Sequence, residues 1–401
     1  MSAPAGLRFQ LACFTLEGIN SFATILYFNY LYFLLRDHYG FDNKRNLCVA
    51  AWLGFTYVFA AWQAGKFAQR RGYFTSLKTG FGLMILGLAA ASQVHFLAGQ
   101  LLAATVTNVG MCFIWPTLEA LTSESEPAAQ LPNVVGLYNI VWAVTNALAF
   151  FIGGALIKWG GYPIISLLPL GLVLCQLTLT FWLQHHATEL ARAAVNQPHR
   201  APPPDPHRPP PQRAKAFLRM AWLANPFAYI AINTLIAVVP GIAAKFQLST
   251  MAAGFICTLW CFVRLGAFAA LWHWTGWHYQ FRWLAVSFAA LIVSFAAILM
   301  SPNLAVLIAA QVFFGVAIGL IYYSSLFYSM DAGDTRGEHG GIHEAAIGLG
   351  NCLGPAIGAL SLQFLPQYAN SGAIAVTGLL LCGLGGLIGI WKTARGSTLT
   401  N

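Results

Sequence analysis

The chain has 401 residues, of which 58% are hydrophobic and only 8% charged, and its formal net charge is +9. Soluble proteins carry about 25% charged residues, so this composition excludes a water-soluble globular enzyme, a disordered protein and a disulfide scaffold. Most lysines and arginines stand at the ends of apolar segments, which is typical of topology determinants and not of a phosphate-binding face. We therefore expect a lipid bilayer around most of the surface and no nucleic-acid partner.

Long apolar segments predict an all-α integral membrane protein with twelve transmembrane helices. A spanning helix needs about 20 mostly apolar residues, whereas the strands of an outer-membrane barrel are short and alternate in hydropathy. The segments here are long and do not alternate. Their predicted ranges are 8–35, 46–68, 73–93, 96–122, 132–158, 162–184, 216–244, 250–274, 281–300, 303–330, 339–365 and 371–392.

A proline-rich segment separates the first six spans from the last six. Residues 198–211 read PHRAPPPDPHRPPP, a composition that excludes a helix and favours an extended polyproline II tether. We expect an N-terminal six-helix bundle over 1–184, a cytoplasmic linker over 185–215 and a C-terminal six-helix bundle over 216–401.

The two predicted bundles share a weak sequence repeat. Asn146 and Gly153 in the fifth span recur at one common offset as Asn351 and Gly358 in the eleventh. Duplication of a six-span unit is typical of several transporter folds, so we expect two pseudo-repeats.

The distribution of basic residues predicts the orientation. If the N-terminus is cytoplasmic, the basic residues on the outer side are few, namely Arg36, Lys44, Arg45, Lys158 and Lys245. Because cytoplasmic loops carry the excess of lysine and arginine, we expect both termini and the linker in the cytoplasm. The chain is then a multi-pass protein of the cell membrane, or of the inner membrane if it is bacterial.

The loop after the second span carries a family resemblance. It runs GKFAQRRG and is similar to the GxLaDrxGrr loop of the major facilitator superfamily, with matches at Gly65, Ala68, Arg70 and Gly72. Gln69 stands where that family usually has aspartate. Together with twelve spans divided six and six, this loop makes the chain resemble that superfamily. The resemblance implies a conformational role for Gly65, Arg70 and Gly72, and a central cavity lined by the first, fourth, seventh and tenth spans.

Four ionisable residues lie inside the predicted spans: Glu17, Glu119, Arg264 and Glu344. Each costs about 2.5–3.5 kcal/mol to insert at the bilayer centre, so each needs a partner or a hydrated cavity. We expect these four and His343 to take part in proton coupling or gating. The alternatives are a polar packing stripe around Glu17, an interfacial carboxylate at Glu119 and a structural ion pair at Arg264.

Polar and aromatic side chains at helical spacing predict the solute contacts. Trp115 and Glu119 lie four residues apart, on one helical face, as do several polar residues that follow Glu17. The predicted contacts are Glu17, Asn20, Thr24, Trp115, Glu119, Asn233, Tyr322 and Ser325. Hydrogen bonding between helices is the alternative role for the neutral members of this group.

The start of the eleventh span contains His339, His343 and Glu344. A zinc site needs three or four ligands, and we expect a pH-sensing or gating element here, with neither a metal nor a cofactor. A metal site at these residues would instead indicate a membrane-embedded enzyme or sensor on a transporter scaffold.

The sequence thus predicts a secondary active transporter that moves a small organic solute by alternating access, coupled to protons, and not an enzyme. The chain has no GxxxxGK[ST] motif for a nucleotide phosphate, so this sequence does not encode ATP drive. An uncoupled facilitator is the further alternative.

Overall fold

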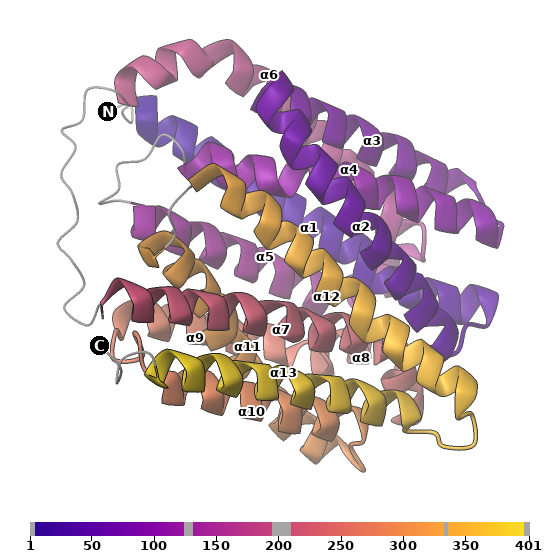
Figure 1. The fold of residues 1–401 in the computed structure, drawn as a ribbon. Coiled ribbons are helices and arrows are strands. Elements are labelled where there is room, and N and C mark those ends of the chain that lie inside the picture. The colour runs from indigo at the N-terminus through magenta and orange to yellow at the C-terminus, as the bar shows by residue number, and fades with distance from the viewer. Residues whose placement is uncertain (1–4, 124–130, 195–209, 333–335, 397–401) are drawn as a thin grey trace. The chain divides into compact units, whose positions relative to one another are not determined.

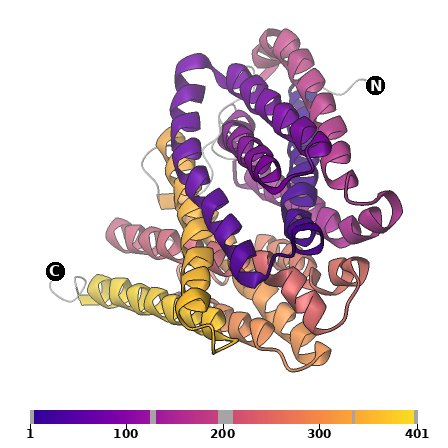
Figure 2. The ribbon, with the colours of Figure 1, turned by 90° about the vertical axis from the view of Figure 1, so that its right-hand side faces the viewer.

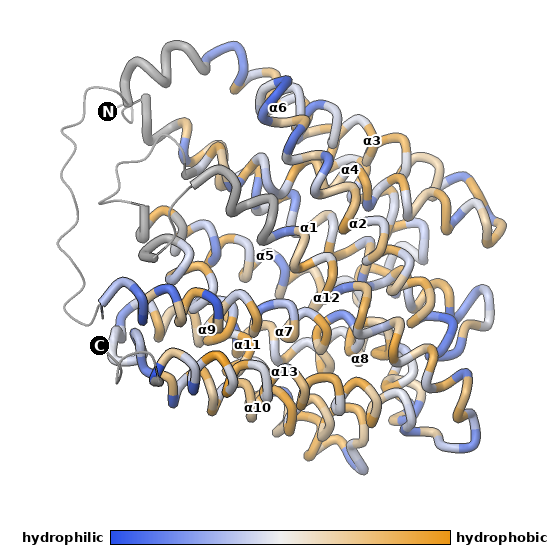
Figure 3. Tube along the Cα trace, viewed as in Figure 1, coloured by the Kyte–Doolittle hydropathy of each residue, from blue (hydrophilic) through white to orange (hydrophobic). Residues whose placement is uncertain are grey.

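The structure is a computed structural model that describes residues 5–123, 131–194, 210–332 and 336–396. These residues form thirteen α-helices and no strand (Figure 1). Twelve helical segments are long and apolar enough to cross a membrane, and hydrophobic residues run along them while hydrophilic residues gather at their ends (Figure 3). The predicted all-α membrane class with twelve spans is confirmed.

The chain divides into two compact units. Unit 1 comprises Met1–Leu31, Thr56–Pro203 and Gly340–Ala345, and unit 2 comprises Tyr32–Phe55, Pro204–His339 and Ala346–Asn401. The helices mainly in unit 1 are α1 Ala5–Tyr39, α2 Asn43–Arg71, α3 Tyr73–Gln93, α4 Leu97–Ser123, α5 Leu131–Gly160 and α6 Ile164–Ala194. Those mainly in unit 2 are α7 Pro211–Lys245, α8 Thr250–Ile256, α9 Leu259–His273, α10 Phe281–Leu299, α11 Leu304–Ala332, α12 Arg336–Phe364 and α13 Ser371–Gly396.

Helices α3 and α4 form the closest helix pair of unit 1. A β-carbon added at Gly80 would lie 2.7 Å from the carbonyl oxygen of Gly110, and one added at Gly110 would lie 2.7 Å from the carbonyl oxygen of Gly80. Small residues at such a crossing let two backbones approach closely in a membrane. Helix α3 also packs against α6, and α5 contacts both α4 and α6.

A single residue, Gly72, joins α2 to α3. Its φ angle is +87°, a conformation that glycine adopts without steric cost and other residues avoid. Arg70 and Arg71 in the last turn of α2 are exposed. Most of the predicted conformational loop, including Gly65 and Arg70, is therefore the last part of α2, and the turn itself is Gly72 alone.

In unit 2, α11 packs against α7, α9 and α10, while α13 packs against α7 and α10 (Figures 1 and 2). The first part of α2 also belongs to this unit, where Lys44 Nζ donates a hydrogen bond of 3.0 Å to Gln363 Oε1 of α12. Gly54 of α2 faces the backbone of Asn351 and Cys352, so the two helices touch without intervening side chains.

The eighth span is interrupted. The sequence pattern predicts one span over 250–274, but α8 ends at Ile256 and α9 begins at Leu259. Lipid offers no hydrogen bonds to backbone groups, and side chains supply them here. Gln311 Nε2 of α11 donates to the carbonyl oxygen of Ile256 at 2.9 Å, and Thr258 Oγ1 donates to that of Gly254 at 2.7 Å.

The helices that flank the proline-rich segment extend into the predicted linker range. Helix α6 continues to Ala194, and α7 begins at Pro211. Proline is tolerated in the first turn of a helix because its missing N–H would have no partner there. Residues 195–209, which hold most of the predicted extended tether, lie outside the described residues.

Candidate functional site

Unit 1 brings three of the predicted acidic residues together. Glu17 of α1, Glu119 of α4 and Glu344 of α12 interact electrostatically with one another, and we call them the carboxyl cluster. The side chain of Glu17 is completely buried and that of Glu344 is 9% exposed, while Glu119 is half-buried. Because like charges repel at short range, the three residues form one electrostatic system.

Neutral hydroxyl groups hold Glu17 in place. Tyr138 of α5 donates a hydrogen bond of 2.6 Å to Glu17 Oε2, and Ser21, one turn further along α1, donates one of 3.0 Å to Glu17 Oε1. Helices α1 and α5 meet closely because Gly18 has no side chain: a β-carbon there would lie 3.3 Å from Thr145 Cγ2. The carboxyl group is thus fixed by hydrogen bonds without a positively charged partner among them.

Glu344 is held in the same way by α2. The hydroxyl of Tyr57 donates a hydrogen bond to Glu344 Oε2. Tyr57 is itself buried and packs with Ala61, Ala64 and Cys112 in a small apolar core. This packing orients the phenol of Tyr57 toward Glu344 of α12, so α2 positions that carboxyl group.

The face of α1 that carries Glu17 also carries polar groups with unused hydrogen-bonding capacity. Asn20 is completely buried, and neither its Oδ1 nor its Nδ2 has a hydrogen-bond partner among the described residues. The hydroxyl of buried Tyr27, two turns further along, also has no such partner. Thr24 differs, because its hydroxyl donates to the carbonyl oxygen of Asn20 at 2.7 Å. Asn20 and Tyr27 therefore each bury polar atoms that the described residues leave without a hydrogen bond.

Glu119 lies near the end of α4, three residues after a proline inside the helix. Pro116 has no N–H to donate to the preceding turn, and α4 continues through it to Ser123. Trp115, four residues before Glu119, is half-buried. The indole and the carboxyl group share a helical face, as the sequence predicts.

Unit 2 contains four further predicted site residues, which are Arg264, Asn233, Tyr322 and Ser325. The guanidinium of Arg264 is buried and lies 5.2 Å from the ring centroid of Trp260, one turn earlier on α9. Asn233 Nδ2 donates to Asn351 Oδ1 at 2.5 Å, which joins α7 to α12. The coupling or gating role predicted for Arg264, with a structural ion pair as its alternative, stays a prediction.

The predicted polar lining of the tenth span lies on α11. The Tyr322 ring centroid is 5.7 Å from that of Phe268 and 6.3 Å from that of Tyr229. Ser325 is completely buried, and its Oγ has no hydrogen-bond partner among the described residues. Asn233, Tyr322 and Ser325 thus give unit 2 a neutral, partly aromatic set of polar groups.

The side chains of His339 and His343 lie outside the described residues. The described part of the chain contains no group of three or more His, Cys, Asp and Glu side chains that could hold a metal ion. The gating role predicted for His343 stays a prediction.

Sequence reasoning missed two residues of this site, Tyr57 and Tyr138. Each places a phenol hydroxyl in an apolar span, and a buried tyrosine hydroxyl usually has a hydrogen-bond partner. That signal could have marked both residues as contacts of a buried acid. It could not have identified which acid, since Tyr57 and Glu344 are 287 positions apart.

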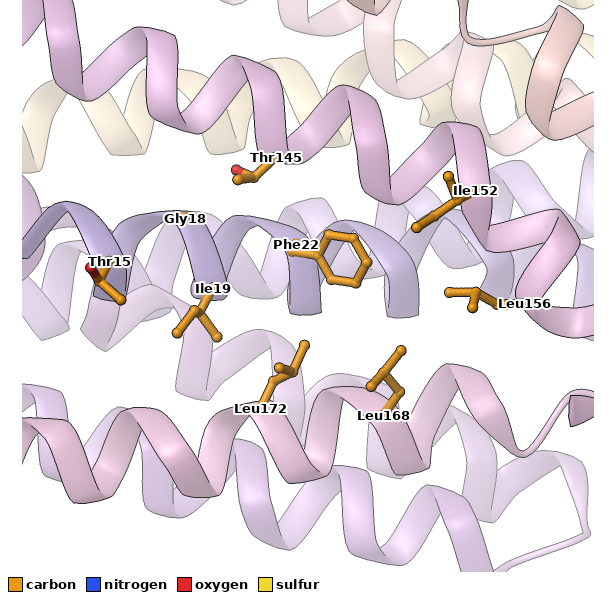
Figure 4. Close-up of a pocket in the computed structure, with 9 residues that line it drawn as sticks. All are labelled: Thr15, Gly18, Ile19, Phe22, Thr145, Ile152, Leu156, Leu168 and Leu172. Atoms are coloured by element: carbon orange, nitrogen blue, oxygen red, sulfur yellow. The ribbon is translucent and has the colours of Figure 1, made fainter.

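An apolar groove of about 500 Å³ lies between α1, α5 and α6. In Figure 4 side chains of all three helices point into it. The hydroxyls of Thr15 and Thr145 at its edge donate to carbonyl oxygens of their own helices. The groove lies on the face of α1 opposite Glu17. Its residues Ile19 and Phe22 stand two and five positions after Glu17, which places them on the other side of the helix. It offers no polar contact to a solute, so we do not place the solute site there.

Comparisons with known proteins give one family. Residues 11–355 match the Major Facilitator Superfamily. Among solved structures, the human organic anion transporter MFSD10 (TETRAN) matches with a TM-score of 0.70 and 14% sequence identity, over 96% of this chain and 100% of that chain. At this identity the likeness shows a shared fold. No curated protein matches significantly. The resemblance drawn from the loop and the spans is confirmed: the chain belongs to the Major Facilitator Superfamily and is a multi-pass membrane transporter.

Proposed function

We propose that this protein is a secondary active transporter that moves a small organic solute by alternating access and couples the movement to protons. It works in the cell membrane with both termini in the cytoplasm, and it is not an enzyme. Its structural neighbour is named as an organic anion transporter, which supports an organic solute as the cargo.

The carboxyl cluster is the observation that carries the proposal. Three acidic side chains from three membrane-spanning helices interact electrostatically, although each is costly to keep in a membrane. A carboxyl group that binds a proton loses its charge and with it the repulsion from its neighbours. Movement of α1, α4 or α12 changes the water and the charges around these groups, and so changes their hold on a proton.

The predicted site residues divide into proton carriers, gating residues and solute contacts. Glu17 is the principal proton carrier and Glu119 the second, while Glu344, His343 and Arg264 act in gating. Asn20, Thr24 and Trp115 of unit 1 contact the solute, as do Asn233, Tyr322 and Ser325 of unit 2. The turn at Gly72, with Gly65 and Arg70 in the preceding part of α2, changes its contacts as the helices move.

Proton-driven accumulation in liposomes tests the proposal. A solute is first identified by its thermal stabilisation of the purified protein, since a ligand that binds the folded state raises its stability. We expect the wild type to concentrate this solute against its gradient when a pH gradient is imposed. Glu17→Gln should abolish accumulation while leaving solute binding measurable. The matched control is Asp37→Asn, an exposed acid on the same helix, which should behave as the wild type.

Two results would contradict parts of this proposal. Accumulation by Glu17→Gln with an unchanged pH dependence would remove Glu17 as the carrier. A wild-type protein that only equilibrates the solute, with or without a pH gradient, would instead be an uncoupled facilitator.

A further inference from the structure

Among the described side chains of unit 1, the carboxyl cluster has no buried lysine or arginine as a counter-charge. Of the lysine and arginine side chains that the structure describes in unit 1, none is buried. Lys66 Nζ lies 3.5 Å from the ring centroid of Trp62, and Lys78 Nζ lies 5.4 Å from that of Phe181. The side chain of Lys66 is exposed and that of Lys78 is partly exposed. The hydroxyls that donate hydrogen bonds to Glu17 and Glu344, those of Ser21, Tyr138 and Tyr57, are neutral. Unit 1 therefore presents a buried site whose charge favours a cation.

Asn20 and Tyr27 give independent evidence for a ligand on the same face of α1. A buried polar group without a hydrogen bond costs about 1–3 kcal/mol, and the Asn20 amide and the Tyr27 hydroxyl both carry this cost among the described residues. Asn20 lies three positions after Glu17 and thus one turn along the same face. Asn20 Oδ1 is an acceptor, and a ligand that brings N–H donors satisfies it.

The spacing of the cluster favours an organic cation over a metal ion. Metal ions in proteins are held by several oxygen ligands at about 2.0–2.6 Å, and the described residues contain no group compact enough for that. An organic ammonium or guanidinium group spreads its charge and its donors over a larger volume. Trp115, on the face of α4 that carries Glu119, adds an aromatic surface of the kind that attracts organic cations.

We infer that the solute is an organic cation, whose protonated amine or guanidinium group binds Glu17 and Asn20. This inference rests on the proposed transport function and specifies its cargo. The N–H groups of the solute donate to the Glu17 carboxylate and to Asn20 Oδ1, and the Tyr27 hydroxyl binds a polar group further along the solute. Tyr27 lies about 15 Å from Glu17 along the helix axis at 1.5 Å per residue, so the solute is extended or carries a second polar group.

Probes of similar size but different charge test this inference on the full chain in detergent. The probes are benzylammonium, benzyl alcohol and benzoate, with butylammonium, butanol and butyrate as an aliphatic set. The expected result is thermal stabilisation by the ammonium member of a set at concentrations where the alcohol and the carboxylate have no effect. Stabilisation by the carboxylates, or no preference for ammonium in either set, would overturn the inference.

Two variants locate the binding groups. Glu17→Gln keeps an oxygen that accepts from Tyr138 but removes the charge, and it should weaken ammonium binding by about tenfold or more. Asn20→Leu should weaken binding while leaving the ligand-free protein as stable as the wild type or more so, because an unpartnered buried amide is replaced by an apolar group of similar size. A purely structural Asn20 would give the opposite pattern. Asp37→Asn is the matched control and should bind as the wild type.

Transport assays separate this inference from the function on which it rests. If benzoate or butyrate accumulates under a pH gradient beyond its level in protein-free liposomes, the transporter function stands and the cationic cargo is overturned. If an ammonium binds through Glu17 but its uptake never exceeds that of protein-free liposomes, the binding site is supported and the transport function is overturned.

Discussion

The hydroxyl of Tyr57 donates a hydrogen bond to Glu344 Oε2, and this contact joins α2 to α12. Both side chains are buried, and both belong to unit 1. Through Glu344, a helix from the second half of the sequence contributes an acid to the cluster that Glu17 and Glu119 begin. The contact is therefore where the proposed proton site depends on both halves of the chain.

Removal of the Tyr57 hydroxyl should destabilise the protein. Tyr57→Phe leaves a buried carboxyl group without this donor, which costs about 1–3 kcal/mol. We expect a lower melting temperature for the purified protein in detergent. Tyr368→Phe is the control, because Tyr368 is 61% exposed. Equal melting temperatures for Tyr57→Phe and the wild type would show that the hydrogen bond contributes nothing.

Replacement of one cluster acid should change how stability depends on pH. The ionised carboxyl groups repel one another in the folded protein and separate on unfolding, so the cluster destabilises the fold as pH rises. Glu344→Gln removes one charge and keeps an oxygen that accepts from Tyr57. We expect its melting temperature to fall less than that of the wild type between acidic and alkaline pH. Asp37→Asn should follow the wild-type curve, and a Glu344→Gln curve parallel to it would argue against repulsion.

The crossing of α3 and α4 should not tolerate a methyl group. Gly80→Ala places a β-carbon 2.7 Å from the carbonyl oxygen of Gly110 and 2.7 Å from Ile114 Cγ1, and overpacking of this kind costs about 1–3 kcal/mol. Gly82→Ala, on the same helix, meets nothing within 4 Å and should be neutral. Thermal melting of the two variants measures the difference. Equal melting temperatures would show that α3 and α4 move apart to accommodate the methyl group without loss of stability.

Gln311 should be required for the interruption of the eighth span. Gln311→Met keeps the size of the side chain but removes the donor to the carbonyl oxygen of Ile256. An unpaired buried carbonyl costs about 1–3 kcal/mol, so we expect a lower melting temperature. Gln212→Met, at an exposed position in the first turn of α7, is the control. A Gln311→Met protein as stable as the control would mean that another group satisfies Ile256.

The sequence predicts the spans well because lipid imposes length and apolarity on every spanning helix. It also marks Glu17, Glu119 and Glu344 one by one, since a charge in a membrane is costly wherever it stands. Their association could not be predicted from local pattern, because it depends on the packing of three helices. Tyr57 and Tyr138 were missed for the same reason.

Hydropathy alone could not predict the interruption between α8 and α9 either. The residues around Cys257 and Thr258 are as apolar as their neighbours, and the side chain that satisfies Ile256 comes from Gln311, 55 positions later. Only the folded chain brings that donor to the carbonyl oxygen.

A continuous helix is a stiff rod, in which a tilt at one end is carried to the other. The span from Thr250 to His273 is instead two shorter helices, α8 and α9. At the break between them, side chains of Thr258 and Gln311 donate hydrogen bonds to the carbonyl oxygens of Gly254 and Ile256. The two pieces therefore depend on α11, through Gln311, for a hydrogen bond that an uninterrupted helix supplies from its own backbone.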